Sequence, residues 1–338
     1  MNILVTGSNG QLGQSLRRIV DCGDNAVTEY PRSRFEYQGN TWIFTSQNGS
    51  VDTEVCENET LHLTSESIIE DFVLTNKINV IINCAAYTDV NGAETIKKCM
   101  DAGENVDDEV YWLNVDVPKW LANAAKLNGA VLIHFSTDYV FNGQTFMPYK
   151  EDRLKLPLNY YGKTKSLGED EVVNSGCHYI IIRTQWLYSP YRGNFVKTMY
   201  NLLSDTEEKD IAVVDDQIGT PTSAFYLALD LTKLIYNNNA EIRSLSQTGI
   251  YHYSADGVCS WYDVANAVRN YKENVEGPCA VRIVPRHSDI NEHVRRPLYG
   301  VLNTDKFYET FHIEKGSCTW WKDQLNETLY VLSHREEN

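Results

Sequence analysis

The chain has 338 residues, of which 42% are hydrophobic and 11% aromatic, and its formal net charge at pH 7 is −16. That length allows one large domain or two ordinary ones with a substantial core, and the composition is typical of a folded protein rather than a disordered one. The negative charge disfavours nucleic acid and anionic membranes as partners. No apolar run approaches the ~20 residues that span a bilayer.

The N-terminal stretch and the cysteines bear on where the protein works. "MNILVTGSNGQLG" has neither the basic lead nor the cleavage site of a signal peptide. The eight cysteines are scattered without a C-x-x-C pair, which favours free thiols in a reducing compartment over a disulfide framework. We therefore expect a cytoplasmic protein. No cluster of metal ligands stands out, so no metal-binding residue is predicted, and bound Mg²⁺ is left open.

Alternating apolar runs and amphipathic stretches predict the fold class. The apolar runs, which are typical of strands buried on both faces, are 2–6, 42–45, 79–85, 131–137, 179–184 and 211–214. The helix-like stretches between them are 11–21, 67–75, 107–127 and 161–174. Pro118 is expected to kink or interrupt the third of these stretches. The alternation predicts an α/β fold with a Rossmann-type, doubly wound parallel sheet.

The texture of the chain changes after about residue 185. Helical segments at 194–203, 223–236 and 318–332 alternate with loops rich in Gly, Pro and Asp. We expect a first domain at 1–185, which a segment at about 211–250 rejoins, and a smaller, partly interleaved α/β domain at 186–338. Apart from the run at 42–45, residues 22–62 are polar and patternless, which predicts long loops or a small excursion there.

Three glycines follow the first predicted strand directly. Gly7, Gly10 and Gly13 in "TGSNGQLG" lie where a strand turns into a helix. Such glycines let the backbone approach a pyrophosphate, whose charge the amides of the helix N-terminus hold. The spacing is G-x-x-G-x-x-G rather than the commoner G-x-G-x-x-G. The first domain is therefore predicted to bind a dinucleotide.

The end of the second predicted strand bears on which dinucleotide is bound. A carboxylate at this point normally binds the ribose hydroxyls of NAD, but "WIFTS" ends in Ser46. This disfavours a strict NAD enzyme and leaves room for the 2′-phosphate of NADPH. Arg32 and Arg34 could reach such a phosphate, although arginines in a polar loop are more often simply solvated. We expect NADPH, with NADH as the alternative.

A tyrosine and a lysine mark the reacting end. Tyr161 precedes Lys165 by four residues in a predicted helix, so both side chains lie on one face, one turn apart. Ser136 and Thr137 end the strand at 131–137, at the edge of the sheet where α/β proteins bind ligands. A chain with 21 tyrosines produces such a pair by chance, so the pair alone is weak evidence.

These motifs together resemble a known superfamily. The glycine turn, "NCAAYT", "STD" and Y-x-x-x-K are similar to those of extended short-chain dehydrogenases/reductases. More narrowly, "STDYVFNG", "PLNYYGKTK", "RTQWLYS", "GNFVKTM", "VVDDQIGTPT" and "RRPLYGVLNTDKF" follow one another as in the dTDP-4-dehydrorhamnose reductase family. The resemblance covers most of the chain and fails mainly in 22–62.

The resemblance implies an oxidoreductase of dTDP-rhamnose biosynthesis. It would reduce the C4 ketone of dTDP-4-dehydro-6-deoxy-L-mannose with NADPH and yield dTDP-L-rhamnose. Tyr161 would donate a proton to the ketone oxygen, and Thr137 would hydrogen-bond that oxygen. Lys165 would lower the pKa of the phenol and bind the nicotinamide ribose.

The resemblance also assigns binding residues. The expected cofactor-binding residues are Gly7, Gly10, Gln11, Leu12, Gly13, Ala85, Ala86, Tyr87, Tyr161 and Lys165. The expected substrate-binding residues are Asp138, Tyr139, Trp186, Arg295 and Arg296. The arginines would grip the diphosphate with their planar forks, although a solvated turn is the alternative, and core packing is the alternative for Trp186. Asn114 either supports a proton-relay water or is a surface amide.

Departures from the family pattern leave other functions open. His62 stands where relatives carry an Asp near the adenine, "NGAE" replaces "DKAE" at 91–94, and Gly300 stands where serine is common. One alternative is a nucleotide-sugar dehydratase or epimerase, although Tyr139 occupies the position of the second carboxylate of the dehydratases. The other is a non-catalytic regulatory subunit like that of methionine adenosyltransferase. A homodimer is a possible assembly.

Overall fold

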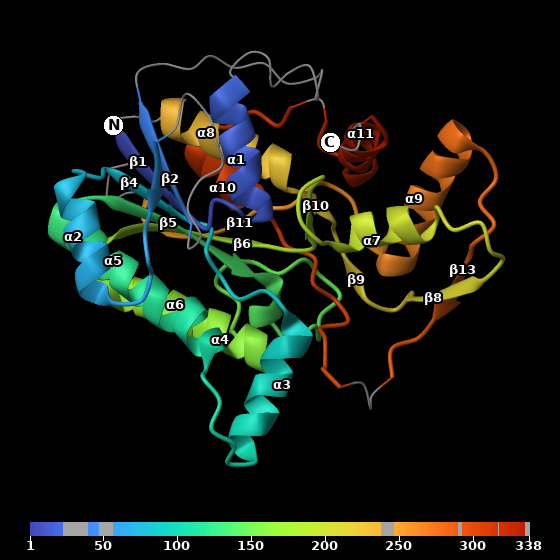
Figure 1. Cartoon of the computed structure of the whole chain (residues 1–338), viewed down its shortest axis with the longest axis horizontal. Helices are drawn as coiled ribbons and strands as arrows, with labels where there is room; N and C mark the ends of the chain where they lie inside the picture. The colour runs from blue at the N-terminus through green and yellow to red at the C-terminus, as the bar shows by residue number, and fades with distance from the viewer. Residues whose placement is uncertain (23–39, 47–56, 238–246, 290–292, 317, 335–338) are drawn as a thin grey trace.

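The computed structural model describes residues 1–22, 40–46, 57–237, 247–289, 293–316 and 318–334. At its centre lies a parallel sheet of seven strands in the order β11-β6-β5-β4-β1-β2-β3 (Figure 1). In chain order these strands are β1 (Asn2–Thr6), β2 (Thr41–Ser46), β3 (Glu57–Thr60), β4 (Val80–Asn83), β5 (Val131–Thr137), β6 (His178–Thr184) and β11 (Gly249–His252). The predicted Rossmann-type α/β fold is confirmed.

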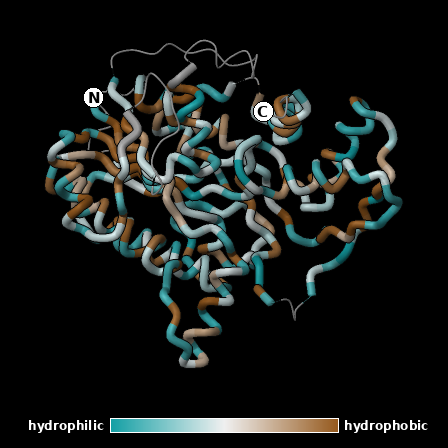
Figure 2. The backbone as a smooth tube through the Cα atoms, viewed as in Figure 1, coloured by the Kyte–Doolittle hydropathy of each residue, from teal (hydrophilic) through white to brown (hydrophobic). Residues whose placement is uncertain are grey.

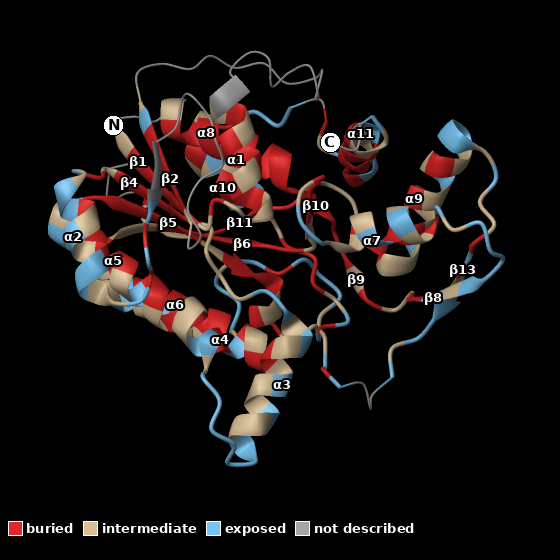
Figure 3. Cartoon of the chain, viewed as in Figure 1, coloured by how far each residue is buried: buried red, intermediate tan, exposed pale blue. Residues whose placement is uncertain are grey.

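Helices cover both faces of this sheet. The helices on one face are α1 (Gln11–Cys22), α8 (Ala224–Asn237) and α10 (Asp305–Phe311), and those on the other are α2 (Glu66–Thr75), α5 (Val117–Asn128) and α6 (Tyr160–Ser175). Successive strand residues point to opposite faces, so Ile3 and Val5 pack in the first layer and Leu4 in the second. Because both faces are buried (Figure 3), the strand sequences are almost continuously apolar.

The long stretch predicted as one interrupted helix has an irregular middle. It comprises α4 (Glu109–Tyr111), a π-helical turn (Trp112–Asp116) and then α5. Pro118 lies in the first turn of α5, where its missing N–H costs no helical hydrogen bond. The predicted interruption is present, and the irregular turn lies just before the proline.

Within 22–62 the predicted strand at 42–45 is present as β2, but a second strand lies where long loops or a small excursion were predicted. β3 extends the sheet by pairing in parallel with β2, although its sequence, "ENET", has no apolar pattern. A strand at the edge of a sheet pairs through its backbone on one side only, so polar residues are compatible with it. Residues 23–39 and 47–56 lie outside the described residues, and so do Arg32 and Arg34.

A second core lies beside the sheet. It is formed mainly by α7 (Phe195–Leu202), α9 (Trp261–Glu276) and α11 (Trp321–Ser333) with the strand pair β8 (Asp210–Val214) and β13 (Arg282–Arg286) (Figure 1). The predicted strand at 211–214 therefore belongs to this pair and not to the central sheet. The remaining elements are α3 (Val90–Asp101), η3 (Asp138–Val140), β7 (Leu187–Tyr188), β9 (Ile218–Gly219), β10 (Thr222–Ser223) and β12 (Cys259–Ser260).

The division into two domains stays a prediction, and the packing suggests how to place it. α8 packs against α1, and β11 joins the central sheet beside β6. We therefore propose that the rejoining segment begins at α8 rather than at residue 211.

Apolar residues concentrate in the central sheet and the helices against it (Figure 2). Within the described part of the chain, no helix combines the length and apolarity needed to cross a bilayer. The cysteines described there, Cys84, Cys99, Cys177, Cys259, Cys279 and Cys318, are free thiols, as expected.

Candidate active site

A cavity of about 850 Å³ opens at the carboxyl ends of the central strands. Its walls are the turn after β1, the ends of β2, β4 and β5, the start of α6, and the segment that follows β6. This is the edge at which ligands bind in open α/β sheets. The cavity therefore contains both ends of the site predicted from the sequence.

The turn between β1 and α1 has no room for a side chain at Gly7 or Gly13. Gly7 has a φ of +62°, and a Cβ on it would lie 2.5 Å from the backbone nitrogen of Ala85. A Cβ on Gly13 would lie 2.5 Å from the Cα of Ser8. Gly7, Gly10, Gln11 and Leu12 line the cavity, whereas Gly13 does not. The turn thus presents backbone and the N-terminus of α1 to the cavity, which suits a pyrophosphate.

The loop after β4 forms the next part of the wall. Ala85 and Ala86 line the cavity, but Tyr87 does not. The backbone of Tyr87 is held by the Asn114 side chain, whose Oδ1 accepts from its N–H at 3.0 Å and whose Nδ2 donates to its carbonyl at 3.1 Å. Asn114 is fully buried and also donates to Thr164 at 3.2 Å. Its interpretation as a surface amide was therefore wrong, and a role in supporting a water stays a prediction.

The three predicted catalytic residues all line the cavity. Asn159 caps α6 by accepting a hydrogen bond from the Gly162 N–H at 2.8 Å. A Cβ on Gly162 would lie 2.3 Å from the carbonyl oxygen of Tyr139, so the start of α6 packs directly against the segment after β5. This packing places Tyr161 beside Thr137, with which it shares a hydrogen bond.

Burial governs the protonation of Tyr161 and Lys165. Desolvation lowers the pKa of Lys165 to about 8, which Glu169 partly opposes. Desolvation raises the pKa of Tyr161, which the hydrogen bond with Thr137 partly opposes. The Lys165 ammonium donates to the Phe135 carbonyl at 2.7 Å and is not among the groups that lower the Tyr161 pKa. The predicted lowering was therefore wrong in this structure, and Tyr161 stays protonated at neutral pH.

Asp138 is the buried carboxylate of the reacting end. Its Oδ1 accepts a hydrogen bond from the Thr137 hydroxyl at 3.0 Å, and burial raises its pKa to about 7. Gly300 lies against it, since a Cβ on Gly300 would be 2.4 Å from Asp138 Oδ2. The glycine that departs from the family pattern thus makes room for this carboxylate.

Aromatic side chains form part of the cavity wall. Trp186 lines the cavity and is half-buried, with a φ of +47°. Its ring stacks on Trp261 at 3.8 Å between centroids, and Phe195 packs on Trp261 at 4.6 Å. Tyr139 and Tyr161, which also line the cavity, meet edge-on with 5.7 Å between their ring centroids. Trp186 therefore reaches the cavity while also packing on a neighbour.

The two predicted diphosphate-binding arginines do not line the cavity. Arg295 is exposed, and its backbone carbonyl accepts from Asn159 Nδ2 at 2.9 Å. Arg296 donates to Asn91 Oδ1 at 2.8 Å and hydrogen-bonds the Tyr139 side chain. In this geometry Arg296 reaches the site only through Tyr139.

Sequence reasoning missed several residues of the wall. They are Leu61, Leu63, Thr88, Gln185, Leu187, Arg192, Asn194 and Phe195, together with Trp261. Leu61 and Leu63 flank His62, which is exposed. The apolar–polar–apolar order of Leu61, His62 and Leu63 in the sequence could have indicated a short segment with one buried face. Of the residues after β6, Gln185, Arg192 and Asn194 lie between regular elements, and Leu187 and Phe195 begin the short β7 and α7, so no periodic signal points to them.

A buried ion pair fixes α6 on the sheet. Glu169 on α6 accepts two hydrogen bonds from Arg183 on β6, both at 2.8 Å, and both side chains are almost fully buried. Lys155 also approaches Glu169 at 3.3 Å. Tyr161, Lys165 and Glu169 follow one another at intervals of four residues on one face of α6. The pair therefore anchors the helix face that carries the predicted proton donor.

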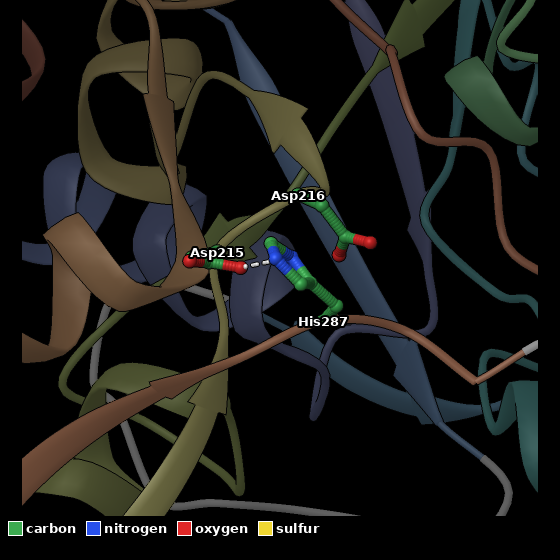
Figure 4. Close-up of side chains that lie close together, drawn as sticks. All are labelled: Asp215, Asp216 and His287. Carbon is green, nitrogen blue, oxygen red and sulfur yellow. Dashed lines mark ion pairs between the residues drawn. The ribbon is translucent and has the colours of Figure 1, made fainter.

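Within the described residues, one group of side chains resembles a metal site. Ligand atoms of Asp215, Asp216 and His287 lie within 4.8 Å of one another (Figure 4). Asp215 is paired with His287 Nδ1 at 2.9 Å, and Asp216 accepts from the backbone N–H and hydroxyl of Ser288 at 2.9 and 2.8 Å. These contacts tie the end of β8 to the end of β13, and we assign no metal to them.

Comparison with known proteins gives matches over nearly the whole chain. A dTDP-4-dehydrorhamnose reductase of Aggregatibacter actinomycetemcomitans is 32% identical over 340 residues, which cover 97% of this chain and 99% of that protein. One from Burkholderia thailandensis is 34% identical over 93% of this chain and 94% of its own.

Solved structures agree with these matches. The crystal structure of a dTDP-4-dehydrorhamnose reductase from Clostridium acetobutylicum has a TM-score of 0.76 at 34% identity and covers 98% of this chain and 100% of its own. That of the Bacillus anthracis enzyme in complex with NADP has a TM-score of 0.76 at 29% identity, over 98% and 99%. The family model described as the RmlD substrate binding domain matches residues 1–333, and the chain belongs to this family.

Proposed function

We propose that the protein reduces the C4 ketone of dTDP-4-dehydro-6-deoxy-L-mannose with NADPH to form dTDP-L-rhamnose. The observation that carries the proposal is that Thr137, Tyr161 and Lys165 line the same cavity as the glycine turn after β1. A dinucleotide on that turn and a ketone beside Tyr161 would share one enclosed space. The names of the relatives support the same reaction.

The residues at the reacting end suit a ketone reduction. When bound, NADPH supplies the hydride. Tyr161 is protonated at neutral pH because burial raises its pKa, so it is the group that donates a proton to the oxygen at C4. The Thr137 hydroxyl, which donates to Asp138 in this structure, would turn to this oxygen and stabilise the charge that develops on it. Lys165, fixed on the Phe135 carbonyl, holds a positive charge beneath the reacting groups and would bind the nicotinamide ribose.

The preference for NADPH rests on the end of β2. Thr45 and Ser46 line the cavity there. Among the described residues of the wall, Asp138 is the only carboxylate, and it follows β5, three strands away from β2. Because the described residues at this end supply no carboxylate to bind the ribose hydroxyls, they favour a 2′-phosphate there. The B. anthracis relative was solved with NADP.

The sugar would lie between the aromatic walls. Tyr139 and Trp186 would contact its apolar faces, and the buried Asp138 would hydrogen-bond a hydroxyl. We propose that Arg296 acts by holding Tyr139, to which it is hydrogen-bonded. A dehydratase would need a second carboxylate after Asp138, and Tyr139 occupies that position.

Reduced-cofactor absorbance tests the proposal directly. The purified protein is offered dTDP-4-dehydro-6-deoxy-L-mannose with NADPH and, separately, with NADH. We expect turnover with NADPH, and a lower kcat/KM with NADH. Tyr161→Phe should lower kcat by at least ~100-fold while NADPH still binds, because a placed proton donor is lost.

Tyr160→Phe is the matched control on the same helix. The Tyr160 hydroxyl bonds Asp108 and lies outside the cavity wall, so kcat should stay close to that of the unmodified protein. Near-normal turnover by Tyr161→Phe would refute the assignment of the proton donor. No oxidation of NADPH by the unmodified protein with this sugar would refute the proposed reaction.

A further inference from the structure

The segment 189–194 is hydrogen-bonded to the glycine turn after β1 and to the start of α1. Ser189 Oγ and Asn194 Nδ2 donate to Gln11 Oε1 at 3.1 and 3.0 Å, and Gln11 Nε2 donates to the Leu187 carbonyl at 3.2 Å. Gln11 is the first residue of α1. Two of these hydrogen bonds therefore join the segment to the N-terminus of α1, where a pyrophosphate would lie, and the third joins Gln11 to the strand just before the segment.

Arg192 is held in an unusual conformation within the segment. Its φ of +51° lies in the left-handed region, which is unfavourable for a residue with a Cβ. Its Nε donates to the carbonyl oxygen of Asn9, in the glycine turn, at 2.6 Å. Non-glycine residues in this region cluster at functional sites, and Arg192 is one of the residues that line the cavity.

The charges of the cavity wall give Arg192 a distinct position. Among the described residues that line the cavity, only Lys165 and Arg192 are cationic. Lys165 lies at the reacting end, where its ammonium is bound to the Phe135 carbonyl. The Nε of Arg192 is engaged with Asn9, and its terminal Nη atoms have no hydrogen-bond partner among the described residues.

We propose that Arg192 binds the pyrophosphate of the dinucleotide and closes segment 189–194 over it. The proposal rests on the proposed function only in that the cavity takes a dinucleotide. A guanidinium offers parallel donors to phosphate oxygens, and the bond from Nε to Asn9 holds the Arg192 guanidinium beside the glycine turn, whose Gly10 and Gln11 line the same cavity. The diphosphate of the nucleotide sugar has the same chemistry. We favour the dinucleotide because Arg192 is anchored to the glycine turn itself.

Titration with NADPH in the absence of any sugar tests the proposal. Arg192→Asn removes the cation, and asparagine tolerates the left-handed conformation. We expect Kd for NADPH to rise about tenfold, which corresponds to about 1.4 kcal/mol. Arg153→Gln is the control, since Arg153 is exposed and outside the cavity wall, and its Kd should not change. A Kd for Arg192→Asn within about twofold of the unmodified protein would overturn the proposal.

A second variant and the salt dependence separate charge from folding. Arg192→Lys keeps the charge but not the planar fork, so its Kd should lie between those of the unmodified protein and Arg192→Asn. Added salt should weaken NADPH binding more in the unmodified protein than in Arg192→Asn, because salt screens the lost contact. Equal Kd values for Arg192→Lys and Arg192→Asn, together with equal salt dependence in all three proteins, would overturn the proposed contact between Arg192 and the pyrophosphate.

A titration with dTDP distinguishes the two diphosphates. We expect Arg192→Asn to bind dTDP as the unmodified protein does. Weaker binding of dTDP with unchanged binding of NADPH would overturn the assignment to the dinucleotide. Because no turnover is measured, the outcome is independent of whether the protein reduces the proposed sugar.

Discussion

The two ends of the cavity are built differently. At the phosphate end, Gly7 and Gly10 present backbone, and among the described wall residues there the only charged side chain is Arg192. At the reacting end, Tyr161, Lys165 and Asp138 all have pKa values shifted by desolvation. Ligand binding at the first end therefore depends on the shape of the backbone, and the chemistry at the second end depends on the protonation of its side chains. An added Cβ should damage the first, and a change of pH should act on the second.

Gly7→Ala should have the largest effect on stability and on NADPH binding. The new Cβ would lie 2.5 Å from a backbone nitrogen in a residue with a φ of +62°, so steric overlap is added to the left-handed strain. We expect a loss of about 3–5 kcal/mol in the free energy of unfolding. Because the turn must also move, Kd for NADPH should rise at least ~100-fold. Urea unfolding and NADPH titration measure the two effects.

Gly129→Ala separates strain from overlap. Gly129 has nearly the same φ, +63°, but nothing lies within 4 Å of an added Cβ. It ends α5, away from the cavity, and the substitution should cost about 1 kcal/mol with no change in NADPH affinity. Equal losses of stability in the two variants would show that the contact with Ala85 does not restrict the turn.

The sequence predicted the parts of the site whose signals are local. The three glycines stand within seven residues, 7–13, and need only a strand before them and a helix after them. Tyr161 and Lys165 are brought together by the pitch of one helix. Since Thr137 ends a strand with a clear apolar pattern, its place at the sheet edge follows from the fold class.

The remaining parts depend on contacts between distant segments. Arg192 and Trp261 reach the cavity through loop geometry and the packing of α9, which leave no periodic trace in the sequence. Arg295 was predicted as a ligand-binding residue but lies outside the wall. Spacing predicted the position of Tyr161 beside Lys165 but not the desolvation of Tyr161, which raises its pKa, so the predicted direction of that pKa was wrong. β3 was missed because a polar edge strand pairs only through its backbone.

The burial of Asp138 predicts a pH effect on stability at the reacting end. Its pKa rises from 3.8 to about 7 on folding, so the folded state binds the proton more tightly. Its contribution to stability is complete below pH 3.8 and is lost as the pH rises through about 7. Asp138→Asn removes this dependence. Between about pH 4 and about pH 8, the difference in unfolding free energy between variant and unmodified protein should change by about 2–4 kcal/mol in favour of the variant.

Asp152→Asn is the control for this measurement. Asp152 is exposed, so its difference from the unmodified protein should vary by less than ~0.5 kcal/mol over the same range. Urea unfolding at a series of pH values gives both curves. A constant difference for Asp138→Asn would mean that Asp138 titrates alike in the folded and unfolded chain, which contradicts its burial.

Of the substitutions proposed at the two ends of the cavity, Gly300→Ser should cause the smallest loss of unfolding free energy. Like Gly7, Gly300 has no room for a Cβ, but its closest neighbour is Asp138 Oδ2 at 2.4 Å, the end of a side chain. Because that carboxylate can rotate away whereas the backbone beside Gly7 cannot, we expect a loss of about 1–3 kcal/mol in unfolding free energy. Gly316→Ser, where nothing lies within 4 Å of an added Cβ, should cost less than ~0.5 kcal/mol.

A double-mutant cycle tests whether displacement of Asp138 is the cause of the loss in Gly300→Ser. If it is, adding Asp138→Ala should recover at least ~1 kcal/mol of that loss. Additive losses would place the strain elsewhere, at Gln185 Oε1, which lies 3.3 Å from the same Cβ.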